Sequence, residues 1–216
     1  MRYSYIFFVL CFLFPVSVLA SVPNLVEQTA ITDIDHISDP TLSQTFYGVL
    51  DGFPHTYEIR AKEPFTLYVE VLIPDTDSAT ENVNGIIIRE TGQKGRVSEV
   101  ARMLAQNASW EPVHEFWGGN NYRMGGVYGA PVEQGVYRIE VSTPDNEAPY
   151  VLVVGTREEF GAIGYFESIK RLMAVKEFFG KSKFTILGAP LVYIPLLVLI
   201  GTLGMVHWYR TRRPVR

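Results

Sequence analysis

The chain has 216 residues, of which 47% are hydrophobic, with one cysteine and a net charge of −4. Residues 21–160 carry 9 Lys and Arg against 21 Asp and Glu, whereas residues 161–216 carry 9 against 2. An acidic body on a basic end excludes a nucleic-acid-binding domain, which would present a basic surface. The single cysteine, Cys11, excludes a framework of internal disulfides.

The first 20 residues have the pattern of a secretory signal peptide. Arg2 precedes an apolar block from Ile6 to Phe14, and the small residue Ala20 stands before Ser21. Such a block is too short to span a membrane as a helix but fits the hydrophobic region of a signal. We therefore expect residues 1–20 to direct export and to be cleaved. An uncleaved N-terminal anchor is the alternative.

Residues 21–160 are expected to form one exported domain of β-strands. Phe65–Ile73 alternates apolar and polar residues, and Val136–Ser142 does the same, which is typical of half-buried strands. In chain order, the predicted strands are Thr45–Leu50, Thr56–Arg60, Phe65–Ile73, Asn84–Arg89, Tyr122–Ala130, Gly135–Ser142 and Pro149–Gly155.

One segment of this domain is predicted to be helical. Val97–Gln106 has Val97, Val100, Ala101 and Leu104 at helical spacing, so a short helix is expected there. The remainder consists of short strands separated by Gly, Pro, Asp and Asn. This pattern predicts a mainly β fold, an antiparallel β-sandwich of the jelly-roll type.

Residues 161–183 are predicted to form an amphipathic juxtamembrane helix. Ala162, Tyr165, Phe166, Ile169, Leu172, Met173 and Phe179 share one side of a helical wheel, and the charged residues Glu167, Lys170, Arg171 and Glu177 share the other. Three positions for this helix remain open. It could lie in the outer headgroup layer, pack on its own sandwich, or dock on a partner's membrane helix.

Residues 184–209 are predicted to cross a membrane as one helix. They contain no Asp, Glu, Lys or Arg, and about 20 such residues span the hydrocarbon core. Pro190 and Pro195 are expected to bend the helix, and Trp208 and Tyr209 fit an interfacial position. The tail, residues 210–216, contains four arginines, which favours a cytoplasmic C-terminus and an exported (periplasmic or extracellular) N-terminal domain.

The stretch from Phe46 to Phe160 resembles the bacterial pre-peptidase C-terminal (PPC) type of β-sandwich. Three segments carry the likeness: Phe46–Ile59 with the long strand that follows it, Gly135–Val141, and Pro149–Gly155. The chain departs from the family at Asn84–Ile88, where the family has an Asp-x-Asp-x-aromatic strand, and no peptidase accompanies it. The resemblance implies the fold and a binding or scaffolding role, and it implies no site residues.

No constellation of catalytic residues is evident in the sequence. Cys11 is expected to leave with the signal peptide, and no nucleophile elbow or phosphate-binding glycine loop is present. Glu111–Glu115 contains His114 without a second histidine at helical spacing, and Pro112 argues against a helix, so a surface loop is expected. We therefore expect a protein that is not an enzyme.

Two kinds of ligand site are nevertheless candidates. Aromatic and amide side chains between Trp110 and Tyr128 could grip a sugar or a partner protein, and the candidate residues are Trp110, Trp117, Asn120, Asn121 and Tyr122. In the alternative interpretation the tryptophans fill the sandwich core and the neighbouring glycines make turns.

Acidic loops are the second candidate, because Ca²⁺ takes six to eight oxygen ligands. The cluster that contains Asp75, Asp77 and Glu81 is one, and residues 33–39 form another. Neither follows the spacing of a known calcium loop, and solvated acidic loops are the alternative.

Taken together, these features predict a non-enzymatic, single-pass membrane protein whose exported β-sandwich binds or scaffolds a partner. The expected partners are the lipid bilayer and another membrane or envelope protein. No cofactor is expected, and Ca²⁺ is the one candidate ion. The alternative is a module that binds carbohydrate, or a ligand in a Ca²⁺-dependent way.

Overall fold

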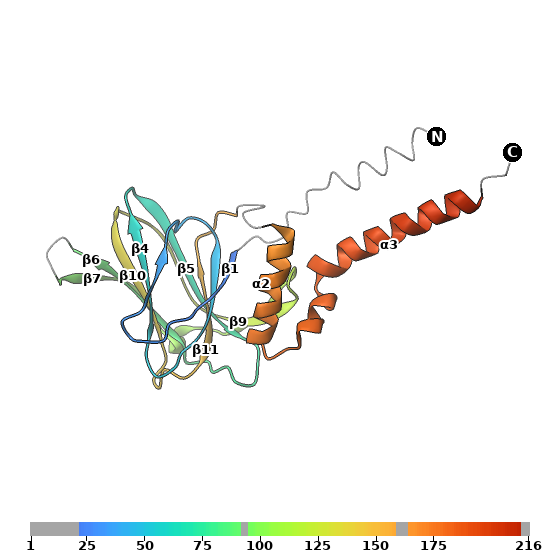
Figure 1. Cartoon of the computed structure of the whole chain (residues 1–216). Helices are drawn as coiled ribbons and strands as arrows, with labels where there is room; N and C mark the ends of the chain where they lie inside the picture. Colours follow the sequence, from blue (N-terminus) through green and yellow to red (C-terminus); the bar gives the residue numbers. More distant parts are fainter. Residues whose placement is uncertain (1–21, 92–94, 159–163, 213–216) are drawn as a thin grey trace.

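Two β-sheets pack face to face in the part of the chain that the structure describes (Figure 1). The computed structural model describes residues 22–91, 95–158 and 164–212, so the predicted signal peptide lies outside the described residues. The six-stranded sheet has the order β1 (Val22–Leu25), β3 (Gln44–Val49), β11 (Pro149–Val154), β5 (Phe65–Pro74), β9 (Asn120–Val132) and β8 (Glu111–Glu115). The five-stranded sheet has the order β2 (Ile34–Ile37), β4 (His55–Ala61), β10 (Gly135–Ser142), β6 (Asn84–Glu90) and β7 (Val97–Met103). The predicted mainly β sandwich is confirmed.

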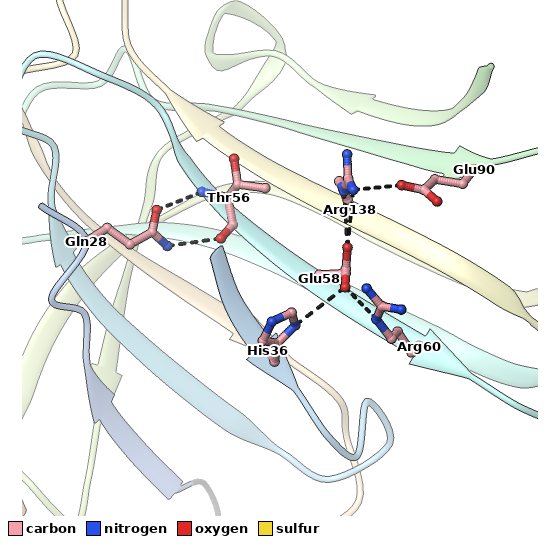
Figure 2. A network of polar contacts seen from close by, with 7 residues as sticks. All are labelled: Gln28, His36, Thr56, Glu58, Arg60, Glu90 and Arg138. Atoms are coloured by element: carbon pink, nitrogen blue, oxygen red, sulfur yellow. Dashed lines mark hydrogen bonds and ion pairs between the residues drawn. The ribbon is translucent and has the colours of Figure 1, made fainter. Parts of the chain in front are cut away.

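Most neighbouring strands are antiparallel, but each sheet has one parallel pair at an edge. β1 runs parallel to β3, and β2 runs parallel to β4. These edge strands are four residues long, too short for a visible alternation, and the sequence did not reveal them. The side chain of Gln28, between them in the chain, both donates to the carbonyl of Thr56 and accepts from its N–H at 3.0 Å (Figure 2). This pair of bonds joins the N-terminal segment to β4.

The core between the sheets follows the predicted alternation. In β5, Leu67, Val69 and Val71 are fully buried, and in β10, Tyr137 and Ile139 point into the same core. Fully burying one such side chain contributes about 1.5–3 kcal/mol, so each of these strands adds substantially to the stability of the sandwich.

A polar cluster lies inside this apolar core. The hydroxyl of Tyr150 lies 2.6 Å from that of Tyr57 and 2.7 Å from Nδ1 of His55. Gly48 in β3 makes room for it, because a Cβ atom at that position would lie 2.5 Å from the Tyr150 ring. The glycine is thus required by close packing, since its backbone is an ordinary strand.

The helix predicted at Val97–Gln106 is wrong, because the structure has β7 there, followed by the 3₁₀ turn η1 (Ala105–Asn107). A β-bulge explains the misleading pattern. Ile87 of β6 pairs with Ala101 and Ile88 pairs with Glu99, so Val100 is an extra residue. Two successive residues, Val100 and Ala101, therefore pack against the core, which imitates helical spacing.

The loop predicted at Glu111–Glu115 is also wrong, because these residues form β8. This strand lies at the edge of the six-stranded sheet and pairs antiparallel with β9. Pro112 is tolerated there because an edge strand can leave one N–H position unpaired.

The helix α2 (Tyr165–Phe178) adds a third layer on the outer face of the six-stranded sheet. In Figure 1 it lies between the sandwich and the C-terminal helix. The helix begins after Gly164 and ends before Gly180, whose φ of 65° lies in the left-handed region that favours glycine. Its place on the sandwich was one of the three positions that the sequence left open.

The C-terminal segment consists of the 3₁₀ helix η2 (Lys183–Gly188) and the long helix α3 (Pro190–Thr211). The predicted spanning helix thus begins at Pro190 instead of residue 184, and Pro190 starts the helix rather than bending it. Pro195 lies inside the helix, as expected. The stretch Pro190–Trp208 is long and apolar enough to cross a membrane, with a mean hydropathy of 1.9.

Candidate functional site

An apolar seam joins the sandwich to the C-terminal helices. From α2 and the segment after it, the buried residues are Leu172, Val175, Phe179, Ile186, Ala189 and Leu191. They pack against outward-facing side chains of the six-stranded sheet, namely Tyr47, Leu72, Tyr122 and Val151. Side chains that share one face recur about every 3.6 residues in α2 and every second residue in the strands, so each element presents one apolar side to this contact. The seam fixes the start of α3 against the domain.

Lys176 is the polar centre of the seam. It is 3% exposed, and its Nζ donates to the carbonyl of Gly118 at 2.6 Å, to Oδ1 of Asn120 at 2.8 Å and to the carbonyl of Gly119 at 3.3 Å. Burial lowers the pKa of this amine and Lys181 lowers it further, while Glu115 opposes both. A buried ammonium is tolerated only when its protons are all bonded, as they are here.

The turn between β8 and β9, residues 116–119, receives this lysine. Oε1 of Glu115 accepts a hydrogen bond of 2.7 Å from the N–H of Gly118. Burial raises the pKa of this carboxyl, and it outweighs the hydrogen bond, which lowers the pKa. The carbonyl of Trp117 accepts from the N–H of Leu191 at 3.2 Å. On the other side, the hydroxyl of Tyr165 donates to the carbonyl of Leu191 at 3.1 Å. The first turn of α3 is therefore bonded both to the sandwich and to α2.

The sequence did not single out Lys176, although it contains a signal for it. Lys176 stands four residues after Leu172 and three before Phe179, so it lies on the apolar stripe of the helix. A lone lysine on such a stripe either extends to solvent or finds acceptors in the layer it covers. Only the fold places the acceptors next to Lys176, because the turn at residues 116–119 is far away from it in the sequence.

The two tryptophans of the candidate aromatic site lie in different places. Trp110 is half-buried against the sandwich core, and its Nε1 donates to the carbonyl of Ala105 at 3.2 Å. Its φ of 51° is unusual for a bulky residue. Trp117 is half-buried at the seam and stacks edge-on with Phe116. The structure therefore does not bring the two rings to one surface.

The remaining candidates of that site are divided in the same way. Asn120 is buried as a partner of Lys176, and Tyr122 is buried with its hydroxyl 3.0 Å from that of Tyr47. Asn121 is exposed, and its Oδ1 lies 2.7 Å from Nδ1 of His114. Three of the five candidates, Trp117, Asn120 and Tyr122, thus belong to the seam.

The candidate calcium ligands are engaged elsewhere. Arg123 donates to Asp75 at 2.9 Å and to Glu81 at 2.7 Å, and Asp77 is exposed nearby. In the second cluster, Asp33 accepts from the backbone N–H groups of Thr29 and Ala30, which closes a turn. Among the described residues, no group of three or more His, Cys, Asp or Glu is placed to hold a metal ion.

A charged network lies on the outer face of the five-stranded sheet (Figure 2). The register places His36, Glu58 and Arg138 side by side on three strands, with Arg60 two residues along on the same face. Oε1 of Glu58 accepts from Arg60 at 2.6 Å, and Oε2 accepts from Arg138 at 3.3 Å. Arg138 also pairs with Glu90 at 2.7 Å.

Glu58 is nearly inaccessible although it lies on an outer face. Its side chain is 2% exposed, whereas that of Arg60 is 71% exposed. Burial raises the pKa of this carboxyl, but the hydrogen bonds from Arg60 and Arg138 outweigh burial and lower the pKa below its usual range. A pocket of about 350 Å³ opens beside the network and is lined by His36, Ile37, Ser38, Glu58 and Arg60.

Comparisons with known proteins give distant similarities to solved structures. No family model matches the chain, and no match is found among the curated proteins. Solved structures similar to it include the pre-peptidase C-terminal domain of a collagenase from Bacillus anthracis, which is 12% identical, with 59% of this chain and 98% of that domain covered and a TM-score of 0.36. Another is the CBM35 domain from Cellvibrio japonicus Abf62, which is 17% identical, with 53% and 74% covered and a TM-score of 0.27.

The PPC-type resemblance expected from the sequence thus reappears among the solved structures. At these identities and TM-scores, neither similarity carries an argument about function. The fold rests on the sheets of this chain itself.

Proposed function

We propose that this chain is a non-enzymatic, single-pass membrane protein that presents an exported β-sandwich to a partner protein of the envelope. The seam carries the proposal. A sandwich that merely needed anchoring could be tethered by a polar linker, whereas here the first turn of α3 is bonded to Trp117 and Tyr165. The seam therefore supports a role in which the domain is held at a fixed height and orientation above the bilayer.

The dimensions of α3 support the membrane assignment. From Leu191 to Trp208 the helix rises about 26 Å at 1.5 Å per residue, close to the ~30 Å of a hydrocarbon core. Only 6% of its apolar stretch is buried in the protein, so this helix is not a core helix of the sandwich. At its far end Trp208 stacks with the Arg212 guanidinium, 4.6 Å from the ring centre, as expected at a headgroup layer.

The surface left for a partner is the outer face of the five-stranded sheet. α2 covers the opposite sheet, so this is the open face of the sandwich, and Figure 1 shows β6 and β7 on the side away from α3. The network around Glu58 holds the Arg60 guanidinium exposed at the edge of a pocket. An arginine fixed in this way is suited to a carboxylate on a partner protein.

Isolation of the full-length protein from native membranes in mild detergent tests the proposal, with bound proteins identified by mass spectrometry. We expect a stoichiometric envelope protein with the wild type and its loss with Arg60→Glu. Arg123→Glu is the matched control, because Arg123 is also exposed and ion-paired but lies in the six-stranded sheet. Retention of the partner by Arg60→Glu would exclude this face, and the lack of any stoichiometric partner would exclude the function.

The carbohydrate-binding alternative has less support. Sugar-gripping sites need exposed rings beside polar groups, and the rings of Trp110 and Trp117 are half-buried in two different clusters.

A further inference from the structure

Three segments that meet near the start of α3 each carry exposed apolar side chains. Phe116 comes from the β8–β9 turn, Phe166 from the start of α2, and Phe184 and Leu187 from η2. They are 54%, 85%, 82% and 60% exposed, respectively. Scattered exposed apolar residues are normal on a protein surface, whereas a concentration around one point indicates an interaction surface.

Hydrogen bonds and chain connectivity tie the three segments to the first turn of α3. Trp117, the neighbour of Phe116, accepts from the N–H of Leu191, and Tyr165, the neighbour of Phe166, donates to the carbonyl of the same residue. In η2, Leu187 lies three residues before Pro190, where α3 begins.

The charge on this side of the protein is opposite to that of the sandwich. α2 and the residues up to 183 carry Lys170, Arg171, Lys176, Lys181 and Lys183 against Glu167 and Glu177, whereas residues 21–160 are strongly acidic. Lys183 pairs with Glu177, Arg171 pairs with Glu167, and Lys176 is buried, so Lys170 and Lys181 carry the excess positive charge. Basic groups next to a membrane span are attracted to anionic lipid headgroups.

We propose that Phe116, Phe166, Phe184 and Leu187 form a bilayer-contact platform that inserts into the headgroup layer of an anionic leaflet. The inference rests on the proposed membrane span. α2 then serves two partners at once, because Leu172 and Val175 pack on the sandwich while Phe166 and Lys170 face the lipid. The acidic sandwich is held outward by the same charge difference that draws the platform inward.

Depth-dependent quenching on the full-length protein tests the platform. Single cysteines, in a Cys11→Ser background, replace Phe116, Phe166, Phe184 or Leu187 and carry a polarity-sensitive fluorophore. The labelled proteins are reconstituted into nanodiscs of phosphatidylcholine with phosphatidylglycerol. One set of discs has nitroxide quenchers near the headgroups and another has them at the centre of the acyl chains. We expect blue-shifted emission that is quenched mainly by the headgroup-proximal nitroxide, with weaker quenching when phosphatidylglycerol is omitted.

Two control positions separate this inference from the proposed function. Leu199→Cys lies in the middle of α3 and should be quenched by the chain-centre nitroxide. Val97→Cys in β7 is as exposed as Phe116 but lies on the far side of the molecule, and it should stay unquenched. Quenching at residue 199 with aqueous emission at all four platform positions would overturn the platform and leave the span intact. Aqueous emission at residue 199 would overturn both, and equal quenching without phosphatidylglycerol would overturn the role of the anionic lipid.

Discussion

Replacing Lys176 with methionine should loosen the seam. Methionine keeps most of the aliphatic stem in place and removes the ammonium, so the carbonyl of Gly118 and the amide of Asn120 lose bonds of 2.6 and 2.8 Å. A buried acceptor left without a partner costs about 1–3 kcal/mol, and removing a buried charge returns part of its desolvation penalty. We expect Lys176→Met to lower the free energy of unfolding by about 2 kcal/mol.

Urea unfolding of the full-length protein in micelles measures this loss, and hydrogen exchange of peptides from residues 165–178 locates it. Lys170→Met is the matched control, because Lys170 lies on the exposed side of the same helix and its replacement should change stability by no more than about 0.5 kcal/mol. If both variants unfold at the same urea concentration and α2 exchanges at the wild-type rate, Lys176 does not hold the seam.

Three further predictions concern the sandwich. Glu58→Gln should lower the free energy of unfolding by about 1 kcal/mol at neutral pH. Because the pKa of Glu58 is lowered in the fold, the wild type should lose this extra stability as the pH falls below about 4.5. Urea titrations of both proteins at several pH values measure the difference. Gly48→Ala should destabilise the protein by about 1–3 kcal/mol, because its Cβ would clash with the buried ring of Tyr150. Gly129→Ala should be tolerated, since its Cβ would meet its nearest neighbour at 3.5 Å. Equal melting temperatures of the two variants would contradict the packing argument. Ca²⁺ at about 10 mM should leave the melting temperature unchanged, because Asp75 and Glu81 are ion-paired with Arg123. A calcium site with a Kd of about 1 mM would instead raise the free energy of unfolding by about 1.4 kcal/mol.

The sequence predicted β5 and β10 well because alternate apolar residues of each strand face the core between the sheets. Their bounds were found within a residue or two, although the end of β5 is buried on both faces, where Leu72 joins the seam. The pattern failed where this condition failed. In β7 the bulge at Val100 places two successive residues against the core, and in β8 the edge position makes Pro112 acceptable.

The candidate site was less accessible to sequence reasoning, because contacts between distant segments define it. The aromatic and amide stretch from Trp110 to Tyr128 was a candidate site, but Lys176, the buried partner of its Asn120, lies more than fifty residues away in the chain. Likewise, the alternation of β4 marks Glu58 as an outward-facing carboxylate. Only strand register shows that Arg138 and His36 enclose it.

The third layer has a consequence for how the protein is made. In the proposed topology the strands cross the membrane first, and the residues that cover the six-stranded sheet, 165–191, cross last. Until they arrive, Tyr47, Leu72, Tyr122 and Val151 form an uncovered apolar face in the exported compartment. In this topology the translocating chain reaches the proposed span only a few residues later, so the sandwich would be completed at about the time the helix enters the membrane. The topology therefore leaves no finished soluble stage, and the intermediate with the uncovered six-stranded sheet is the one most prone to aggregation.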